Sequence, residues 1–158
     1  MPRSLPASID WPAIDAWLAE RFPQLPQTEP DALARDLATP GARPVVLLDV
    51  RSAGEHAVSH LPGARHAPDI DTALAVLADR PVGTRVIAYC SVGVRSARLA
   101  EALRARGVAS VENLRGSIFA WAHRGLPLCD ARGPVTHVHP FDAAWGRLLD
   151  PALHAPTG

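Results

Sequence analysis

The residues best suited to chemistry lie in the segment Arg85–Gly107, RVIAYCSVGVRSARLAEALRARG, in which an apolar run ends at Cys90. A short loop containing Gly93 and Arg95 follows, and a helix-like pattern begins after it. The backbone N–H groups of such a loop and the positive end of the helix dipole favour an anion, and the nearest candidate is the sulfur of Cys90. Helix starts and neighbouring arginines lower the pKa of a thiol, so the pattern predicts a thiolate nucleophile at neutral pH.

Two further residues of this loop have expected roles, and we expect the loop to face solvent. Gly93 suits a tight turn with positive φ and lets the backbone approach whatever binds there. Arg95 offers a forked donor to an incoming oxyanion. The alternative is that Cys90 only fills the core, because free cysteine is among the most buried residue types. The loop alone does not decide between the two hypotheses, a reactive cysteine and a structural one.

The elements around the loop alternate between strands and helices. Short apolar runs predict buried strands in PVVLLDV (44–50), RVIAYC (85–90) and SVENL (110–114). Helical spacing and end signals predict helices over residues 12–22, 30–39, 71–80, 96–106 and 117–125. This alternation indicates an α/β domain with a mainly parallel sheet. Cys90 then lies at the carboxyl edge of the sheet, where open α/β folds bind ligands.

Length and composition limit the possible functions. A chain of 158 residues suits one domain with extensions. Sixteen basic and sixteen acidic residues give no net charge, so neither nucleic acid nor an anionic membrane is favoured as a partner. The two cysteines stand apart rather than in a CxxC pair, which fits a reducing compartment better than a disulfide framework or a zinc site. Without a signal-length or membrane-spanning apolar run, we expect a soluble, cytoplasmic protein.

Three segments together closely resemble the rhodanese (thiosulfate sulfurtransferase) family. LLDVRSAGEHAVSHLPGARHAP (47–68) resembles its first signature, a strand ending in Asp-x-Arg, then an acidic residue, a histidine and Pro-Gly-Ala. YCSVGVRS (89–96) looks like its active-site loop, and residues 98–127 are similar to its closing part, with a tryptophan-bearing helix and Gly-x-Pro. The agreement covers about residues 30–130.

The resemblance implies a single-domain member with a rhodanese-like three-layer α/β fold. Its central, mainly parallel sheet would have about five strands, with helices on both faces. The expected organisation is an N-terminal extension with a short helix (1–29), the rhodanese-like domain (30–128) and a C-terminal appendage (129–158). Within the appendage the pattern predicts one short helix near Phe141–Leu149.

Loop length separates two chemistries within this architecture. The loop from Cys90 to Arg95 has six residues, as in the sulfurtransferases, whereas the related cell-division phosphatases have a longer loop that encloses phosphate. The resemblance therefore implies transfer of a sulfane sulfur through a persulfide on Cys90, without a cofactor or metal. The residues that would cradle the persulfide are Ser91, Val92, Gly93, Val94, Arg95 and Ser96.

The implied partners are sulfur donors and acceptors. The donor would be a small molecule such as thiosulfate or a persulfide, and the acceptor a low-molecular-weight thiol, a protein thiol or, in assays, cyanide. The alternative of another class is a sulfur-relay or regulatory binding module with little turnover of its own. Phosphatase activity is disfavoured by the short loop.

The sequence departs from the family pattern at two turns. Ser59 stands where the family has glycine before the histidine, and Arg115 stands where it often has the first of two glycines. Arg115 would add positive charge near the loop if its turn lies close by. We expect Asp49 and Arg51 to fix the end of a strand and to pair with Glu55 or with neighbouring loops. We expect His60 to hydrogen-bond a turn rather than act as a base.

The remaining reactive side chains have simpler expected roles. His137 and His139 have no clear carboxylate or thiol partner, so we do not expect them to bind a metal. Cys129 would either resolve the persulfide as a disulfide or remain an inert thiol, and we favour the inert thiol. Trp121 is expected to anchor its helix in the core.

Overall fold

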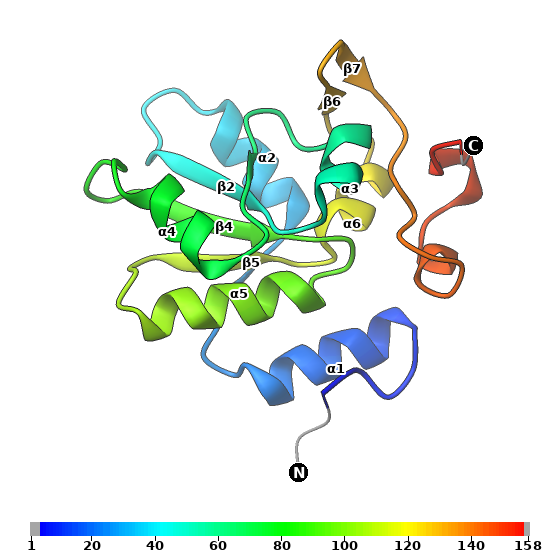
Figure 1. The fold of residues 1–158 in the computed structure, drawn as a ribbon, viewed down its shortest axis with the longest axis horizontal. Coiled ribbons are helices and arrows are strands. Elements are labelled where there is room, and N and C mark those ends of the chain that lie inside the picture. The colour runs from blue at the N-terminus through cyan, green and yellow to red at the C-terminus, as the bar shows by residue number, and fades with distance from the viewer. Residues whose placement is uncertain (1–3, 157–158) are drawn as a thin grey trace.

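A computed structural model describes residues 4–156, which form a five-stranded parallel sheet with helices on both faces (Figure 1). The strand order is β1-β5-β4-β2-β3, and every pairing in it is parallel. The strands are β1 (Gln27–Thr28), β2 (Val45–Asp49), β3 (Arg65–His66), β4 (Arg85–Tyr89) and β5 (Val111–Leu114). The structure thus confirms the expected α/β class and the sheet of about five strands.

Strand β4 occupies the middle of the sheet and leads directly to Cys90. Its residues Val86 to Tyr89 are fully buried, as the uninterrupted apolar run predicts for a strand covered on both faces. Asp49 at the end of β2 lies opposite Tyr89 in the register. The Asp49 side chain and the loop that follows Tyr89 therefore lie next to each other at the carboxyl edge of the sheet.

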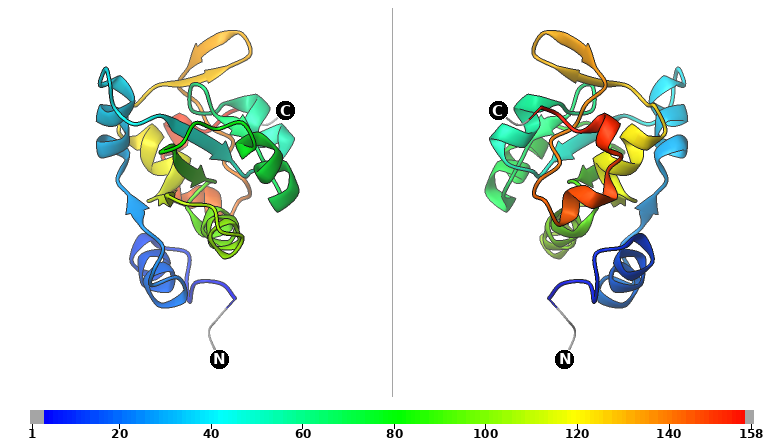
Figure 2. Two further views of the ribbon diagram at one scale, coloured as in Figure 1. Left: turned by 90° about the vertical axis from the view of Figure 1, so that its left-hand side faces the viewer. Right: turned by 90° about the vertical axis from the view of Figure 1, so that its right-hand side faces the viewer.

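The helices form the two outer layers. Helices α2 (Pro30–Ala38) and α6 (Ser117–His123) pack against each other on one face, and α4 (Ile70–Leu77) and α5 (Val94–Ala105) on the other (Figure 2). Helix α3 (Ala53–Val58) begins just after β2, where Ser52 and Glu55 form a reciprocal capping box. None of the helices within residues 4–156 combines the length and apolar character needed to cross a membrane.

The N-terminal segment is joined to the sheet. Helix α1 (Trp11–Arg21) buries Ile14, Trp17 and Leu18 and contacts α5, which confirms that this helix packs on the main body. The expected extension 1–29 also contains β1, which pairs with β5 at the edge of the sheet. A strand of two residues has no detectable period, so the sequence pattern could not reveal it.

The C-terminal segment forms a hairpin and two short 3-10 turns. The hairpin consists of β6 (Leu128–Asp130) and β7 (Gly133–Val135), and the turns are η1 (Trp145–Leu148) and η2 (Pro151–Leu153). The expected helix at Phe141–Leu149 is therefore shorter than predicted and has 3-10 geometry. Phe141 has a φ of 72°, outside the helical region, and Asp142 Oδ1 accepts a hydrogen bond from the Trp145 N–H, so helix formation starts late.

Candidate active site

Cys90 is fixed at the carboxyl edge of β4 by the start of α6. Its N–H donates to Ser117 Oγ at 3.1 Å, and Ser117, held at a φ of 48°, donates in turn to the Leu114 carbonyl at 3.0 Å. The carbonyls of Cys90 and Ser91 accept hydrogen bonds from the N–H groups of Ile118 and Phe119, both at 3.1 Å. The first residues of the loop are therefore rigidly placed.

The sulfur of Cys90 lies among hydrogen-bond donors. The Gly93 N–H donates to Sγ at 3.1 Å, and Ser96 Oγ lies 3.5 Å from it. Burial raises the pKa of the Cys90 thiol, but the charge of Arg95, the Ser96 hydroxyl and the N–H groups of Ser96 and Gly93 lower it more. The pKa therefore lies below its ordinary value, and these contacts favour the thiolate that the loop pattern predicts.

Cys90 does not face solvent, contrary to our expectation, since only 1% of it is exposed. Instead it lines a cavity of about 130 Å³, together with residues of its own loop and of α5. The cavity is bounded on its other sides by Leu5, Phe141 and Trp145, which come from the two ends of the chain. Burial alone would suit a core-filling cysteine, whereas the adjoining cavity and the Gly93 N–H directed at the sulfur suit an anionic thiolate that a small molecule can reach.

Gly93 has the positive φ that the sequence predicts, at 111°, but the close approach it permits is to the protein. A Cβ there would meet Asn113 Nδ2 at 3.3 Å and Ser117 Oγ at 3.6 Å, behind the loop, rather than a bound molecule. The approach of the Gly93 backbone to a bound ligand stays a prediction, and the Gly93 N–H faces the Cys90 sulfur. Gly93 also allows the loop to pack tightly on β5 and α6.

Replacing Gly93 with alanine is expected to destabilise the protein by about 1–3 kcal/mol, because a non-glycine residue is strained at this φ. The displaced Gly93 N–H should also slow the alkylation of Cys90 by iodoacetamide at neutral pH. Gly107→Ala is the matched control, since Gly107 has a φ of 84° with open space around its Cβ position. The control should lose stability but keep full thiol reactivity, and equal reactivity in both variants would contradict the role of the Gly93 N–H.

The guanidinium of Arg95 is already engaged, contrary to the expected free fork. Its Nη1 and Nη2 donate to the two carboxylate oxygens of Glu55 at 2.9 and 3.1 Å, and Nη2 also donates to Ser91 Oγ at 2.9 Å. The side chain of Glu55 is 4% exposed. Burial raises the pKa of Glu55, but Arg95, the Ser52 N–H and the charge of Arg51 together lower it more, so the pair is ionised. Arg95 thus acts on Cys90 through its charge, which Glu55 partly balances.

Asn113 supports the loop from behind, a role that sequence reasoning missed. It is fully buried, and its Oδ1 accepts a hydrogen bond from Ser96 Oγ at 2.6 Å. Its Nδ2 donates to the Gly93 carbonyl and to Gln27 Oε1, both at 3.1 Å. The available signal was a polar amide within the short strand VENL, since buried amides require partners.

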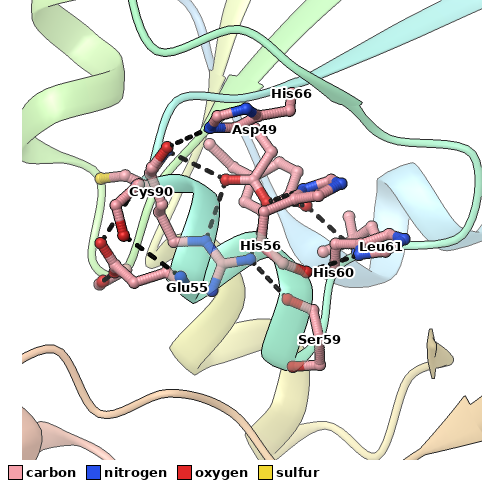
Figure 3. A network of polar contacts seen from close by, with 12 residues as sticks. Asp49, Glu55, His56, Ser59, His60, Leu61, His66 and Cys90 are labelled. Atoms are coloured by element: carbon pink, nitrogen blue, oxygen red, sulfur yellow. Dashed lines mark hydrogen bonds and ion pairs between the residues drawn. The ribbon is translucent and has the colours of Figure 1, made fainter. Parts of the chain in front are cut away.

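Asp49 and Arg51 form a buried ion pair beside the loop, and neither is exposed (Figure 3). Arg51 Nε and Nη2 donate to the two oxygens of Asp49 at 2.9 and 2.7 Å, and Nη2 also donates to the Ser59 carbonyl at 2.6 Å. Asp49 Oδ2 further contacts His56 Nδ1 at 2.7 Å and accepts from Tyr89 Oη at 3.0 Å. These contacts confirm that the two residues fix the end of β2 and bond a neighbouring loop at Ser59, whereas the carboxylate of Glu55 pairs with Arg95.

Arg115 does not contribute charge to the loop. It pairs with Asp15 Oδ2 at 2.8 Å and with Glu29 Oε1 at 2.9 Å, so it ties α1 to the turn after β5. It is not among the described residues that line the cavity at Cys90. The positive charge of Arg115 is instead balanced by the carboxylates of Asp15 and Glu29.

Cys129 lies in β6 and is bonded through its backbone to His60, at 2.9 and 3.0 Å. Burial raises the pKa of its thiol, which disfavours the thiolate that disulfide exchange requires. His60 Nδ1 contacts the His56 carbonyl at 2.8 Å, as expected for a histidine that holds a turn. Trp121 is buried in the core, and its indole N–H donates to the Pro127 carbonyl at 2.8 Å.

The histidines of the C-terminal segment take part in local contacts. His139 Nδ1 accepts a hydrogen bond from the Phe141 N–H at 3.0 Å. Within residues 4–156, no three histidine, cysteine or acidic side chains come together in a way that could hold a metal ion.

This chain is similar in sequence to one family model and to several known proteins. Residues 29–124 match the family model described as Rhodanese-like domain. A sulfurtransferase from Allochromatium vinosum is 35% identical over 89 residues, which cover 56% of this chain and 82% of that protein. The probable adenylyltransferase/sulfurtransferase MoeZ from Mycobacterium tuberculosis is 34% identical over 86 residues, 54% of this chain.

A likeness is also found among solved structures. The crystal structure of thiosulfate sulfurtransferase from Pseudomonas aeruginosa aligns with a TM-score of 0.63 and 27% identity, covering 72% of this chain. This chain spans only 22% of the length of that protein and of the mycobacterial relative. The likeness to these longer proteins therefore concerns one part of each of them.

Proposed function

The chain belongs to the family of rhodanese-like domains, and from this premise we propose that it is a sulfurtransferase that carries a sulfane sulfur as a persulfide on Cys90. The observation that carries the proposal is the position of the Cys90 sulfur, which accepts the Gly93 N–H at 3.1 Å and adjoins a cavity. Sulfurtransferase relatives at 34–35% identity support the same chemistry.

The proposed reaction has two half-reactions. The Cys90 thiolate attacks the sulfane sulfur of a donor such as thiosulfate, a bond forms between the two sulfurs, and sulfite leaves with the electron pair of the broken S–S bond. An acceptor thiolate, or cyanide, then attacks the outer sulfur, and Cys90 leaves as the thiolate again. The Gly93 N–H and the charge of Arg95 stabilise the anionic sulfur in both steps. Such covalent catalysis gives ping-pong kinetics.

The second candidate is a sulfur-relay module, and the burial of Cys90 favours it. A thiol that is 1% exposed, in a cavity bounded in part by Leu5, Phe141 and Trp145, exchanges slowly with small molecules that do not fit this cavity. Such a protein would accept one sulfur and hold it for a partner. The two candidates therefore share the persulfide and differ in the rate of turnover.

Intact mass spectrometry after thiosulfate treatment tests the proposal. We expect the mass of the reduced protein to rise by one sulfur atom and to return to its starting value when cyanide is added. Fast steady-state release of thiocyanate would then identify the enzyme, and a full mass shift with slow release would identify the relay module. Absence of any mass shift would overturn the persulfide chemistry.

Replacing Arg95 with glutamine is expected to shift the reactivity of Cys90 to higher pH. Arg95 lowers the pKa of the thiol, and its loss leaves the carboxylate of Glu55 near the sulfur without its partner. The rate of alkylation by iodoacetamide, measured against pH, should therefore have its midpoint at higher pH in the variant. Arg104→Gln removes another paired arginine of α5 and should leave the midpoint in place. Identical midpoints in the wild type and Arg95→Gln would refute the role of Arg95.

A further inference from the structure

The outer wall of the cavity at Cys90 comes from segments outside the family match. The match covers residues 29–124, whereas Leu5 precedes it and Phe141 and Trp145 follow it. In Figure 1 the C-terminal segment lies on the side of the sheet where α5 begins, and α1 lies along the same helix. Any ligand selectivity that this wall provides therefore depends on the two ends of this chain and not on the matched residues 29–124.

Specific contacts hold the aromatic part of the wall in place. Phe141 adopts a φ of 72°, its N–H donates to His139 Nδ1, and its ring lies 4.7 Å from the guanidinium carbon of Arg95. The Trp145 N–H donates to Asp142 Oδ1 at 2.8 Å. A backbone held in a strained region next to a reactive group indicates a local constraint linked to function. Phe141 is also 42% exposed, so core packing does not account for its position.

The size and lining of the cavity exceed what an inorganic donor needs. Its volume of about 130 Å³ is close to that of an engineered apolar cavity, about 150 Å³, that holds benzene. Most of its lining is apolar and includes the side chains of Leu5, Val92, Val94, Phe141 and Trp145. Thiosulfate is a small, strongly hydrated dianion without apolar surface, so it would leave this wall without a partner.

The charges at the cavity suit a monoanion. Arg95 is shared between Glu55 and the Cys90 sulfur. Arg98 also lines the cavity, and its contacts within the described residues are with the Ser4 carbonyl and the ring of Trp17, neither of which is an anion. Of the two arginines that line the cavity, Arg98 is thus the one without an anionic partner among the described residues, so one negative charge of a bound donor can be paired there.

We propose that the cavity formed by the two ends of the chain binds the apolar body of an organic sulfur donor, a monoanion whose terminal sulfane sulfur reaches Cys90. The proposal rests on the persulfide chemistry above and names the class of donor. With an organic thiosulfonate, R–SO₂–S⁻, Sγ attacks the terminal sulfur, the S–SO₂ bond breaks, and the sulfinate R–SO₂⁻ leaves with the electron pair. No oxidant or reductant is consumed.

Benzenethiosulfonate and thiosulfate are matched probes, because they present the same sulfane sulfur and differ in a phenyl group against a charged oxygen. With cyanide as acceptor, kcat/KM of the wild type should be higher for benzenethiosulfonate. In Phe141→Ala/Trp145→Ala, the ratio of kcat/KM for benzenethiosulfonate to that for thiosulfate should fall about tenfold or more, as apolar contacts in a specificity pocket do. Leu37→Ala truncates an exposed apolar side chain on α2 that does not line the cavity, and should leave the ratio unchanged.

The outcomes separate this inference from the proposed function. If persulfide forms on Cys90 but the double variant loses activity with both donors equally, the cavity does not select the donor and the inference is wrong. The inference also fails if the wild type prefers thiosulfate. If neither donor adds a sulfur to the wild type, the proposed function itself fails. Should the double variant not fold, the single variant Phe141→Ala gives the same ratio test, since that side chain is 42% exposed.

Discussion

Replacing Cys90 with alanine is expected to reduce sulfur transfer to the uncatalysed rate while the protein keeps its fold. Alanine has no atom on which a persulfide can form, and no alternative route leads from donor to acceptor in a ping-pong mechanism. The loop remains held by the backbone contacts of residues 90 and 91 with the start of α6. The loss of one sulfur atom from a site that already adjoins a cavity should cost about 1 kcal/mol.

Three measurements on the variant check this prediction. Thiocyanate release from thiosulfate and cyanide should fall to the rate without protein, the mass shift after thiosulfate should vanish, and the urea midpoint should change little. Cys129→Ala is the matched control, because Cys129 is the other cysteine of the chain and its pKa is raised. It should retain both the mass shift and turnover. Thiosulfate-dependent turnover in Cys90→Ala, or a persulfide on Cys129 in the wild type, would contradict the assignment.

The parts of the fold that the sequence predicts are those determined locally. The strand ending at Tyr89, the loop and the helix after it follow from a buried apolar run, a glycine and helical spacing, and the family match confirms the resemblance found in these residues. Helix α5 begins at Val94, two residues before the predicted start, because Gly93 acts as its N-cap in a left-handed conformation. Capping by glycine leaves no side-chain signal, so a shift of this size is expected.

The features of the site that the sequence does not predict depend on contacts between distant residues. Leu5 and Phe141 line the same cavity as Cys90, although they come from opposite ends of the chain. Arg95 is engaged because Glu55 in α3 lies beside it, although 40 residues separate them. The sequence shows which kind of side chain stands at each of these positions, but it does not show which distant residue that side chain contacts. The charges near the thiol could therefore be listed from the sequence, whereas their balance could not.

The buried pair of Asp49 and Arg51 supports the same edge of the sheet. Asp49 contacts Tyr89, the residue before Cys90, and the N–H of Val50 donates to the Tyr89 carbonyl at 3.0 Å. Figure 3 shows this network between Cys90 and Glu55 on one side and His56 and His60 on the other. The loop is therefore supported from β2 by a fully desolvated ion pair, and its rigidity depends on the stability of that pair.

Replacing Asp49 with asparagine is expected to destabilise the protein by about 3–5 kcal/mol, because it leaves the guanidinium of Arg51 buried without a countercharge. Urea unfolding at neutral pH measures the loss. The control Asp31→Asn, which breaks the exposed pair with Arg124, should cost less than about 1 kcal/mol.

The stability that Asp49 contributes depends on pH. Burial raises the pKa of Asp49, but Arg51 and His56 lower it more. The stabilisation is therefore present above the ordinary carboxylate pKa and is lost as pH falls through the lowered value. The difference in stability between wild type and Asp49→Asn should thus shrink in acid. The double variant Asp49→Leu/Arg51→Met should lose less than Asp49→Asn, because it leaves no buried charge. A loss in Asp49→Asn no larger than that in Asp31→Asn would show that Arg51 finds another partner and that the pair does not support the loop.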